Sequence, residues 1–159
     1  PLVAGGRKRV ATVTAFTVAH SMTLAAATLG WVKMPQAPVE AIIALSILFV
    51  AAEIVHWRQG KEGVTRRKPW LVAFTFGLLH GFGFAGALSE IGLPEHAIPL
   101  ALLFFNLGVE AGQLLFIGVV FAAWAVIRKV PMPEWAWRIP VYGIGTMAAF
   151  WTIERISGF

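Results

Sequence analysis

The sequence predicts an all-α fold, a polytopic transmembrane helix bundle of about five spanning helices. Hydrophobic residues make up 58% of the chain and charged residues 13%, whereas an ordinary soluble domain has roughly 45–50% and 25%. The 159 residues suffice for five crossings of about 20 residues each. The basic residues flank the apolar stretches. We therefore expect a single transmembrane domain over residues 1–159, surrounded by a lipid bilayer.

Five apolar stretches are long enough to cross a bilayer. They cover residues 10–32, 38–57, 70–91, 98–127 and 135–156. Tryptophans at the ends of these stretches support the boundaries, because the indole ring favours the membrane–water interface; they are Trp31, Trp57, Trp70, Trp135 and Trp137. The fourth stretch is the longest and requires tilt or a break near Pro99.

The distribution of positive charge predicts the orientation of these helices. If the chain crosses five times, only Lys33 and Arg155 of its 13 Lys and Arg residues fall on the side opposite the amino-terminal end. Cytoplasmic loops of membrane proteins carry the excess of Lys and Arg. We therefore expect the amino-terminal end and the basic loops to be cytoplasmic, in a bacterial inner membrane.

Several classes of function are disfavoured. The chain has no Cys, so thiolate metal sites are excluded. It has neither a phosphate-binding loop with its Lys, nor a Gly-x-Ser-x-Gly elbow, nor a His-Glu-x-x-His motif, so we expect no nucleotide and no enzyme of these types. The basic residues do not form a patch with aromatic residues, which disfavours nucleic acid as a partner.

Three ionisable residues lie near the midpoints of their predicted spans: His20, His80 and Glu110. Such a side chain at the bilayer centre costs at least about 2.5–3.5 kcal/mol, so it needs a partner or a purpose. Asn106, Glu110 and Gln113 follow the i, i+4, i+7 spacing of one helix face. Imidazole nitrogen with carboxylate and amide oxygen suits nickel, cobalt or zinc. We therefore expect a metal site of His20, His80, Asn106 and Glu110.

Other polar residues extend this pattern along a predicted ion pathway. Glu40 and Glu90 lie near the outer interface, and Glu53 and His56 near the cytoplasmic one. Polar residues around the metal ligands form a second shell, for which we predict Thr17, Ser21 and Gln113. Glycines four residues apart let helices approach closely; these are Gly77, Gly81, Gly108 and Gly112.

Four motifs together resemble the HupE/UreJ family over essentially the whole chain. They are Ala-Phe-Thr-Val-Ala-His-Ser-Met-Thr-Leu at 15–24, the run from Val39-Glu40 to Ala52-Glu53, Phe-Gly-Leu-Leu-His-Gly-Phe-Gly-Phe-Ala at 76–85, and Phe-Asn-Leu-Gly-Val-Glu-Ala-Gly-Gln at 105–113. The resemblance implies a permease for nickel or cobalt, with the divalent ion as its substrate, associated with hydrogenase and urease maturation.

This sequence differs from the family pattern at two places. Family members carry an earlier helix with a His and an Asp-His pair that this chain does not match, so we expect an N-terminal helix to be missing upstream. Where the family often has Glu-Asn, this chain has Glu53-Ile54. The partners expected are the metal ion, the bilayer, and either that helix or a second copy of the chain.

Two other functions remain open from the residues. His20 and His80 are suited to be the axial ligands of a haem in an electron-transfer subunit. Alternatively, the polar residues form a surface that docks a partner helix through hydrogen bonds worth about 0.6 kcal/mol each, in a membrane assembly subunit that transports nothing.

Overall fold

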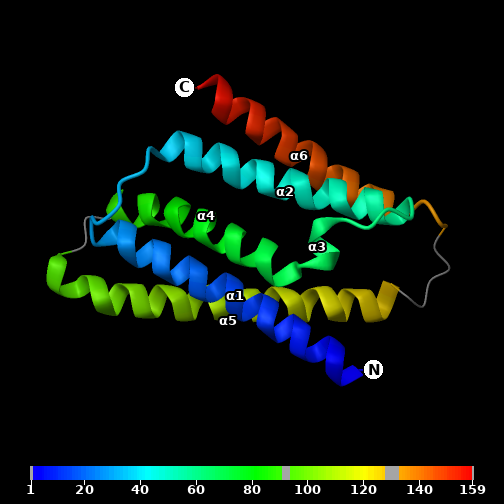
Figure 1. Ribbon diagram of the computed structural model, residues 1–159, viewed down its shortest axis with the longest axis horizontal. Helices are drawn as coiled ribbons and strands as arrows, with labels where there is room; N and C mark the ends of the chain where they lie inside the picture. The colour runs from blue at the N-terminus through cyan, green and yellow to red at the C-terminus, as the bar shows by residue number, and fades with distance from the viewer. Residues whose placement is uncertain (1, 91–93, 128–132, 159) are drawn as a thin grey trace. The chain divides into compact units, whose positions relative to one another are not determined.

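The structure is a computed structural model that describes residues 2–90, 94–127 and 133–158 (Figure 1); of residues 2–10, 87, 89, 90 and 95 only the backbone is described. Its regular elements, in chain order, are α1 (Leu2–Thr28), α2 (Gln36–Arg58), α3 (Val64–Arg67), α4 (Pro69–Glu90), the 3-10 helix η1 (Glu95–Ala97), α5 (Ile98–Ile127) and α6 (Arg138–Ser157). Every element within the described residues is helical. The predicted all-α class is confirmed.

Proline and glycine mark the ends of these helices. Pro38, Pro69, Pro99 and Pro140 each lie in the first turn of a helix, where the missing N–H group would have no intrahelical partner. Of the two alternatives predicted for the fourth span, a break near Pro99 is not observed, because α5 begins at the residue before Pro99 and continues to Ile127; tilt stays a prediction. Gly30 follows α1 and Gly60 follows α2, and both have a positive φ, 75° and 81°, which glycine adopts without a steric penalty.

The helices agree closely with the predicted spans. Three are long and apolar enough to cross a membrane within the described residues: Gln36–Arg58, Pro69–Gly86 and Ile98–Ile127. α1 and α6 are less apolar, and their crossing stays a prediction. α1 begins at Leu2, eight residues before the predicted start at residue 10, and ends at Thr28 rather than at residue 32, because the turn at Gly30 stops it. α6 begins at Arg138 rather than at residue 135, after a turn in which the Arg138 N–H donates to the Trp135 carbonyl at 2.9 Å. Ile91 lies outside the described residues.

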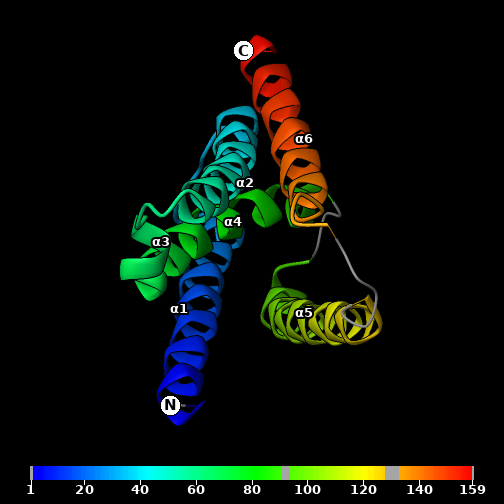
Figure 2. The same cartoon turned by 90° about the vertical axis from the view of Figure 1, so that its right-hand side faces the viewer.

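The chain divides into two compact units, residues 1–93 with 140–159, and residues 94–139. In the first unit α1 and α4 form the most extensive helix contact, and α4 also packs against α2. The short α3 lies beside the ends of α2 and α4, where the chain turns from one to the other (Figure 2). The second unit is built on α5, none of whose residues is buried. That the chain is one domain stays a prediction.

Small residues bring α1 and α4 close together. A Cβ atom built on Gly77 would collide with the Phe16 carbonyl oxygen, and one on Gly81 would collide with the Thr23 hydroxyl. The residues buried beside them include Ala19 and Leu24, both fully buried. Lipid offers no hydrophobic driving force between helices, so their association depends on such close van der Waals packing.

Candidate functional site

His20 lies inside the contact between α1 and α4, with only 2% of its surface exposed. Its ring stacks on Phe16, with the centroids 5.9 Å apart and the planes at 10°, and meets the edge of Phe84 at 5.4 Å. Neither ring nitrogen has a hydrogen-bond partner within the described part of the chain. A buried polar group left without a partner costs about 1–3 kcal/mol. The helix contact therefore holds an imidazole whose polar atoms are uncompensated.

His80 lies on the facing helix, α4, and contacts the same phenyl ring. Its ring centroid is 5.7 Å from that of Phe16. The Nδ1 atom is 2.7 Å from the carbonyl oxygen of Phe76. When Nδ1 carries the proton it donates to that carbonyl, and Nε2 keeps the lone pair with which a histidine binds metal. The two predicted histidines thus share one aromatic neighbour, Phe16.

A cavity of about 380 Å³ adjoins His80. Side chains from four helices line it: Phe16 on α1; Ser46, Ile47, Val50, Ala51 and Ile54 on α2; Phe76 and His80 on α4; Pro140, Val141 and Ile144 on α6. The lining is almost entirely apolar. The Ser46 hydroxyl donates to the Ile43 carbonyl at 2.7 Å, so the imidazole of His80 is the stronger candidate for binding a ligand there.

The other two predicted ligands lie on α5, in the second unit. The Asn106 amide donates to the Leu102 carbonyl at 2.9 Å. Glu110 is exposed within its own unit, and Gln113, one turn further, is half-buried. Among the described residues, no three His or Glu side chains gather closely enough to hold an ion. The four-residue metal site therefore stays a prediction.

The polar residues predicted around the metal ligands and the glycines predicted at helix contacts also lie partly in the first unit and partly on α5. Thr17 and Ser21 are half-buried on α1 with His20. Gly77 and Gly81 lie against α1, whereas a Cβ built on Gly108 or Gly112 meets no described atom within 4 Å apart from its chain neighbours and the backbone of its own helix. A packing role for Gly108 and Gly112 stays a prediction.

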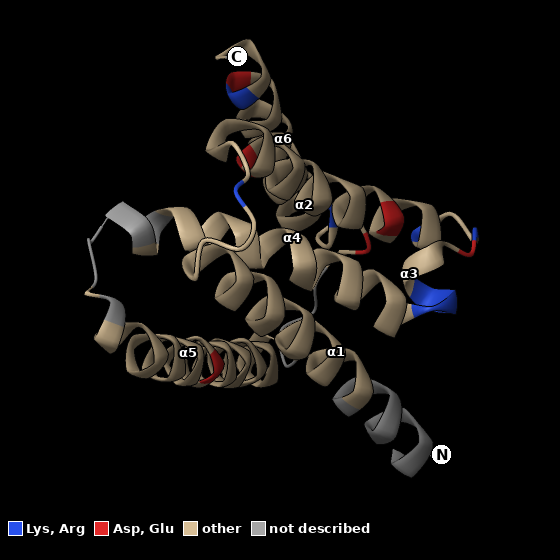
Figure 3. Ribbon diagram, turned by 60° about the vertical axis from the view of Figure 1, so that its left-hand side comes forward, with Lys and Arg blue, Asp and Glu red and all other residues tan. Residues whose placement is uncertain are grey.

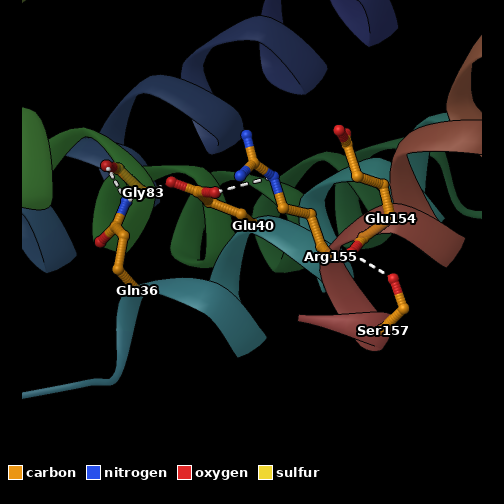
Figure 4. Close-up of polar contacts among 6 residues, drawn as sticks. All are labelled: Gln36, Glu40, Gly83, Glu154, Arg155 and Ser157. Atoms are coloured by element: carbon orange, nitrogen blue, oxygen red, sulfur yellow. Dashed lines mark hydrogen bonds and ion pairs between the residues drawn. The ribbon is translucent and has the colours of Figure 1, made fainter. Parts of the chain in front are cut away.

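At the predicted outer end Glu40 has partners that the sequence did not reveal. Its carboxylate forms an ion pair with Arg155 on α6, in which Oε2 lies 3.0 Å from Nε. Its Oε1 atom accepts a hydrogen bond from the Gln36 amide at 3.2 Å. The same amide nitrogen donates to the Gly83 carbonyl on α4 at 3.0 Å (Figure 4). Glu40 thus joins α2 to α6 rather than presenting an isolated carboxylate. The side chain of Glu90 lies outside the described residues.

At the other end Glu53 also contacts a neighbouring segment. Its Oε2 accepts a hydrogen bond from the backbone N–H of Thr65 at 2.9 Å, and its carboxylate lies where a Cβ on Gly63 would stand. The carboxylate therefore anchors the first turn of α3 to α2. His56 is exposed one turn further along α2. A pathway role for Glu53 and His56 stays a prediction.

A family model described as HupE / UreJ protein matches residues 2–155 of the chain. The chain belongs to the HupE/UreJ family. The matched residues include α1 with His20, α4 with His80, α5 and most of α6, so all the site residues discussed above lie within the match. No curated protein and no solved structure matches the chain. HupE/UreJ is a family of transport and accessory proteins associated with nickel and cobalt, and its membership, together with three apolar helices, makes this chain an integral membrane protein.

Proposed function

We propose that the protein carries a divalent transition-metal cation, nickel or cobalt, across the membrane. The observation that supports this most directly is the buried imidazole of His20, whose two nitrogens have no partner in the described structure. α1 is one of the predicted spans, and an ionisable residue inside a membrane span marks a functional site by default. Nitrogen ligands of this kind suit borderline divalent ions.

His80 provides the second nitrogen of the proposed site. It lies on the helix that packs closest to α1, and its Nδ1 contact with the Phe76 carbonyl leaves Nε2 to bind the ion. The sequence pattern adds Asn106 and Glu110 to the proposed ligands, and Thr17, Ser21 and Gln113 to the polar residues expected to support them. Because a metal-binding His must be neutral and a carboxylate ionised, protonation weakens binding, which couples release of the ion to pH.

Uptake of radioactive nickel or cobalt tests the proposal. We expect cells that produce the protein to accumulate more of the isotope than cells with an empty vector. An excess of the other unlabelled metal should compete for uptake. Accumulation at the vector level, with folded protein present in the membrane fraction, would refute metal import. A Soret band in the purified protein would instead support the haem function.

Topology reporters test the orientation proposed with this function. A reporter fused within residues 58–68 should be active as a cytoplasmic fusion, because five of the 13 Lys and Arg residues lie there. One fused after Pro94 should be active as an external fusion, because α4 separates the two points. If both fusions report the same side, α4 does not span and the model of five crossings is wrong.

A further inference from the structure

The segment between α2 and α4 concentrates positive charge at the membrane surface. Residues 58–68 contain five cations, Arg58, Lys61, Arg66, Arg67 and Lys68, and Figure 3 shows Lys and Arg gathered at α3. Both flanking helices are candidate membrane spans, so the segment lies where the headgroups of the bilayer are. Clusters of four to eight cations beside a membrane helix attract anionic lipids.

A cavity of about 330 Å³ opens among these residues. Seven residues line it: Val50, Glu53, Ile54, Trp57, Gly63, Thr65 and Arg66. Ile54 and Val50 lie one and two turns inside α2 from Trp57. At 1.5 Å per residue, the lining therefore extends roughly 10 Å along the helix from headgroup depth toward the hydrocarbon. A cavity that is cationic at its surface end and apolar at its inner end fits a phospholipid.

Arg66 supplies the group that would bind the phosphate. Its guanidinium carbon lies 5.8 Å from the centre of the Trp57 ring. The guanidinium carbon of Arg58 lies 5.4 Å from the same centre. A guanidinium is planar, stacks on aromatic faces, and presents its N–H donors in a fork that binds phosphate oxygens in pairs. No carboxylate pairs with Arg66 in the described structure, whereas Arg67 pairs with Glu62 at 3.6 Å.

Two other polar groups of the cavity are consistent with this assignment. The Thr65 hydroxyl is buried and has no hydrogen-bond partner within the described residues, so its hydrogen-bonding capacity is unused beside the cavity. The carboxylate of Glu53 would repel an anion, but it accepts the Thr65 backbone N–H and lies against Gly63. That contact keeps α3, and with it Arg66, beside α2.

We propose that this cavity binds one anionic phospholipid, with the headgroup phosphate at Arg66 and an acyl chain along Ile54 and Val50. The ligand is separate from the metal ion of the proposed function, and neither proposal requires the other. Such a lipid would fix α3 against the ends of α2 and α4.

Lipid retention by the purified protein tests this assignment. Native mass spectrometry would compare phosphatidylglycerol with zwitterionic phosphatidylethanolamine, each added to the protein in mixed micelles. We expect the wild type to retain phosphatidylglycerol preferentially. Arg66→Gln should weaken that binding about fivefold, the effect of one surface cation on an anionic membrane. The matched variant Arg67→Gln removes the same charge from the neighbouring residue, which does not line the cavity, and should weaken it less than twofold.

Several outcomes would overturn the assignment. Equal losses in Arg66→Gln and Arg67→Gln would show unspecific attraction by the surface charge. Equal retention of the two lipids in the wild type would exclude an anionic site. Displacement of the lipid by millimolar inorganic phosphate would identify free phosphate as the ligand. Arg66 is exposed, so its replacement should leave the elution profile of the protein unchanged, and that profile is the control for folding.

Discussion

Replacing Gly81 by Ala is expected to lower the yield of folded protein severalfold. The added Cβ would meet the Thr23 hydroxyl, the His20 carbonyl oxygen and, at 3.0 Å, the Leu24 backbone nitrogen. Two of these three atoms belong to the backbone of α1 and cannot move unless the helix moves. Overpacking of a close contact costs about 1–3 kcal/mol even where side chains can adjust, and here the adjustment must separate α1 from α4. The measurement is the monodisperse fraction in gel filtration after detergent extraction, with the melting temperature of that fraction.

Gly143→Ala is the matched control for this substitution. Gly143 also lies inside a helix, α6, but a Cβ built on it meets no described atom within 4 Å apart from its chain neighbours and the backbone of its own helix. Because Ala favours helix by about 1 kcal/mol over Gly, this variant should be as stable as the wild type or more so. Gly81→Leu should be worse than Gly81→Ala. Equal behaviour of Gly81→Ala and Gly143→Ala would mean that α1 and α4 do not pack through Gly81.

The helices could be predicted from the sequence because in a membrane their signals are local. A run of about 20 apolar residues must satisfy its own backbone hydrogen bonds, and only a helix does so within one segment. Residues 38–57 and 98–127 therefore correspond to α2 and α5 almost residue for residue. The ends differ at α1 and α6: a Schellman-type turn at Gly30 ends α1 before residue 32, a turn before Arg138 delays the start of α6, and α1 begins eight residues before the predicted start.

The partners of the polar residues could not be predicted in this way. Depth along a helix follows from sequence position, so His20 and His80 could be placed at one level. The direction in which a side chain faces depends on helix rotation, which no local pattern fixes. The sequence did not indicate that Phe16 would contact both imidazoles. Nor did it show that Arg155 would neutralise Glu40, although Arg155 was one of two cations predicted for the same side as Glu40.

Replacing His20 by Phe is expected to reduce nickel or cobalt uptake to the vector level while the protein still folds. Phe keeps a flat ring of similar size against Phe16 and Phe84 and removes both nitrogens. Those nitrogens have no protein partner in the described structure, so their removal should not lower the free energy of unfolding. Without bound metal, the variant should have a higher melting temperature than the wild type. Loss of one nitrogen ligand should weaken metal binding by at least about 100-fold, since even an outer-shell partner is worth 10–100-fold.

This pair of readouts separates the metal site from simple packing. If His20 only packs against Phe16, His20→Phe should gain stability and keep its transport activity. If His20 binds the ion, the variant should lose uptake, and added nickel should raise the melting temperature of the wild type but not that of the variant. His20→Ala should also lose uptake, but at a cost in stability, because it leaves a cavity beside Leu24. His96→Ala changes an exposed residue of η1 and should match the wild type in both uptake and melting temperature. If His20→Phe takes up as much metal as the wild type, His20 is not part of the transport site.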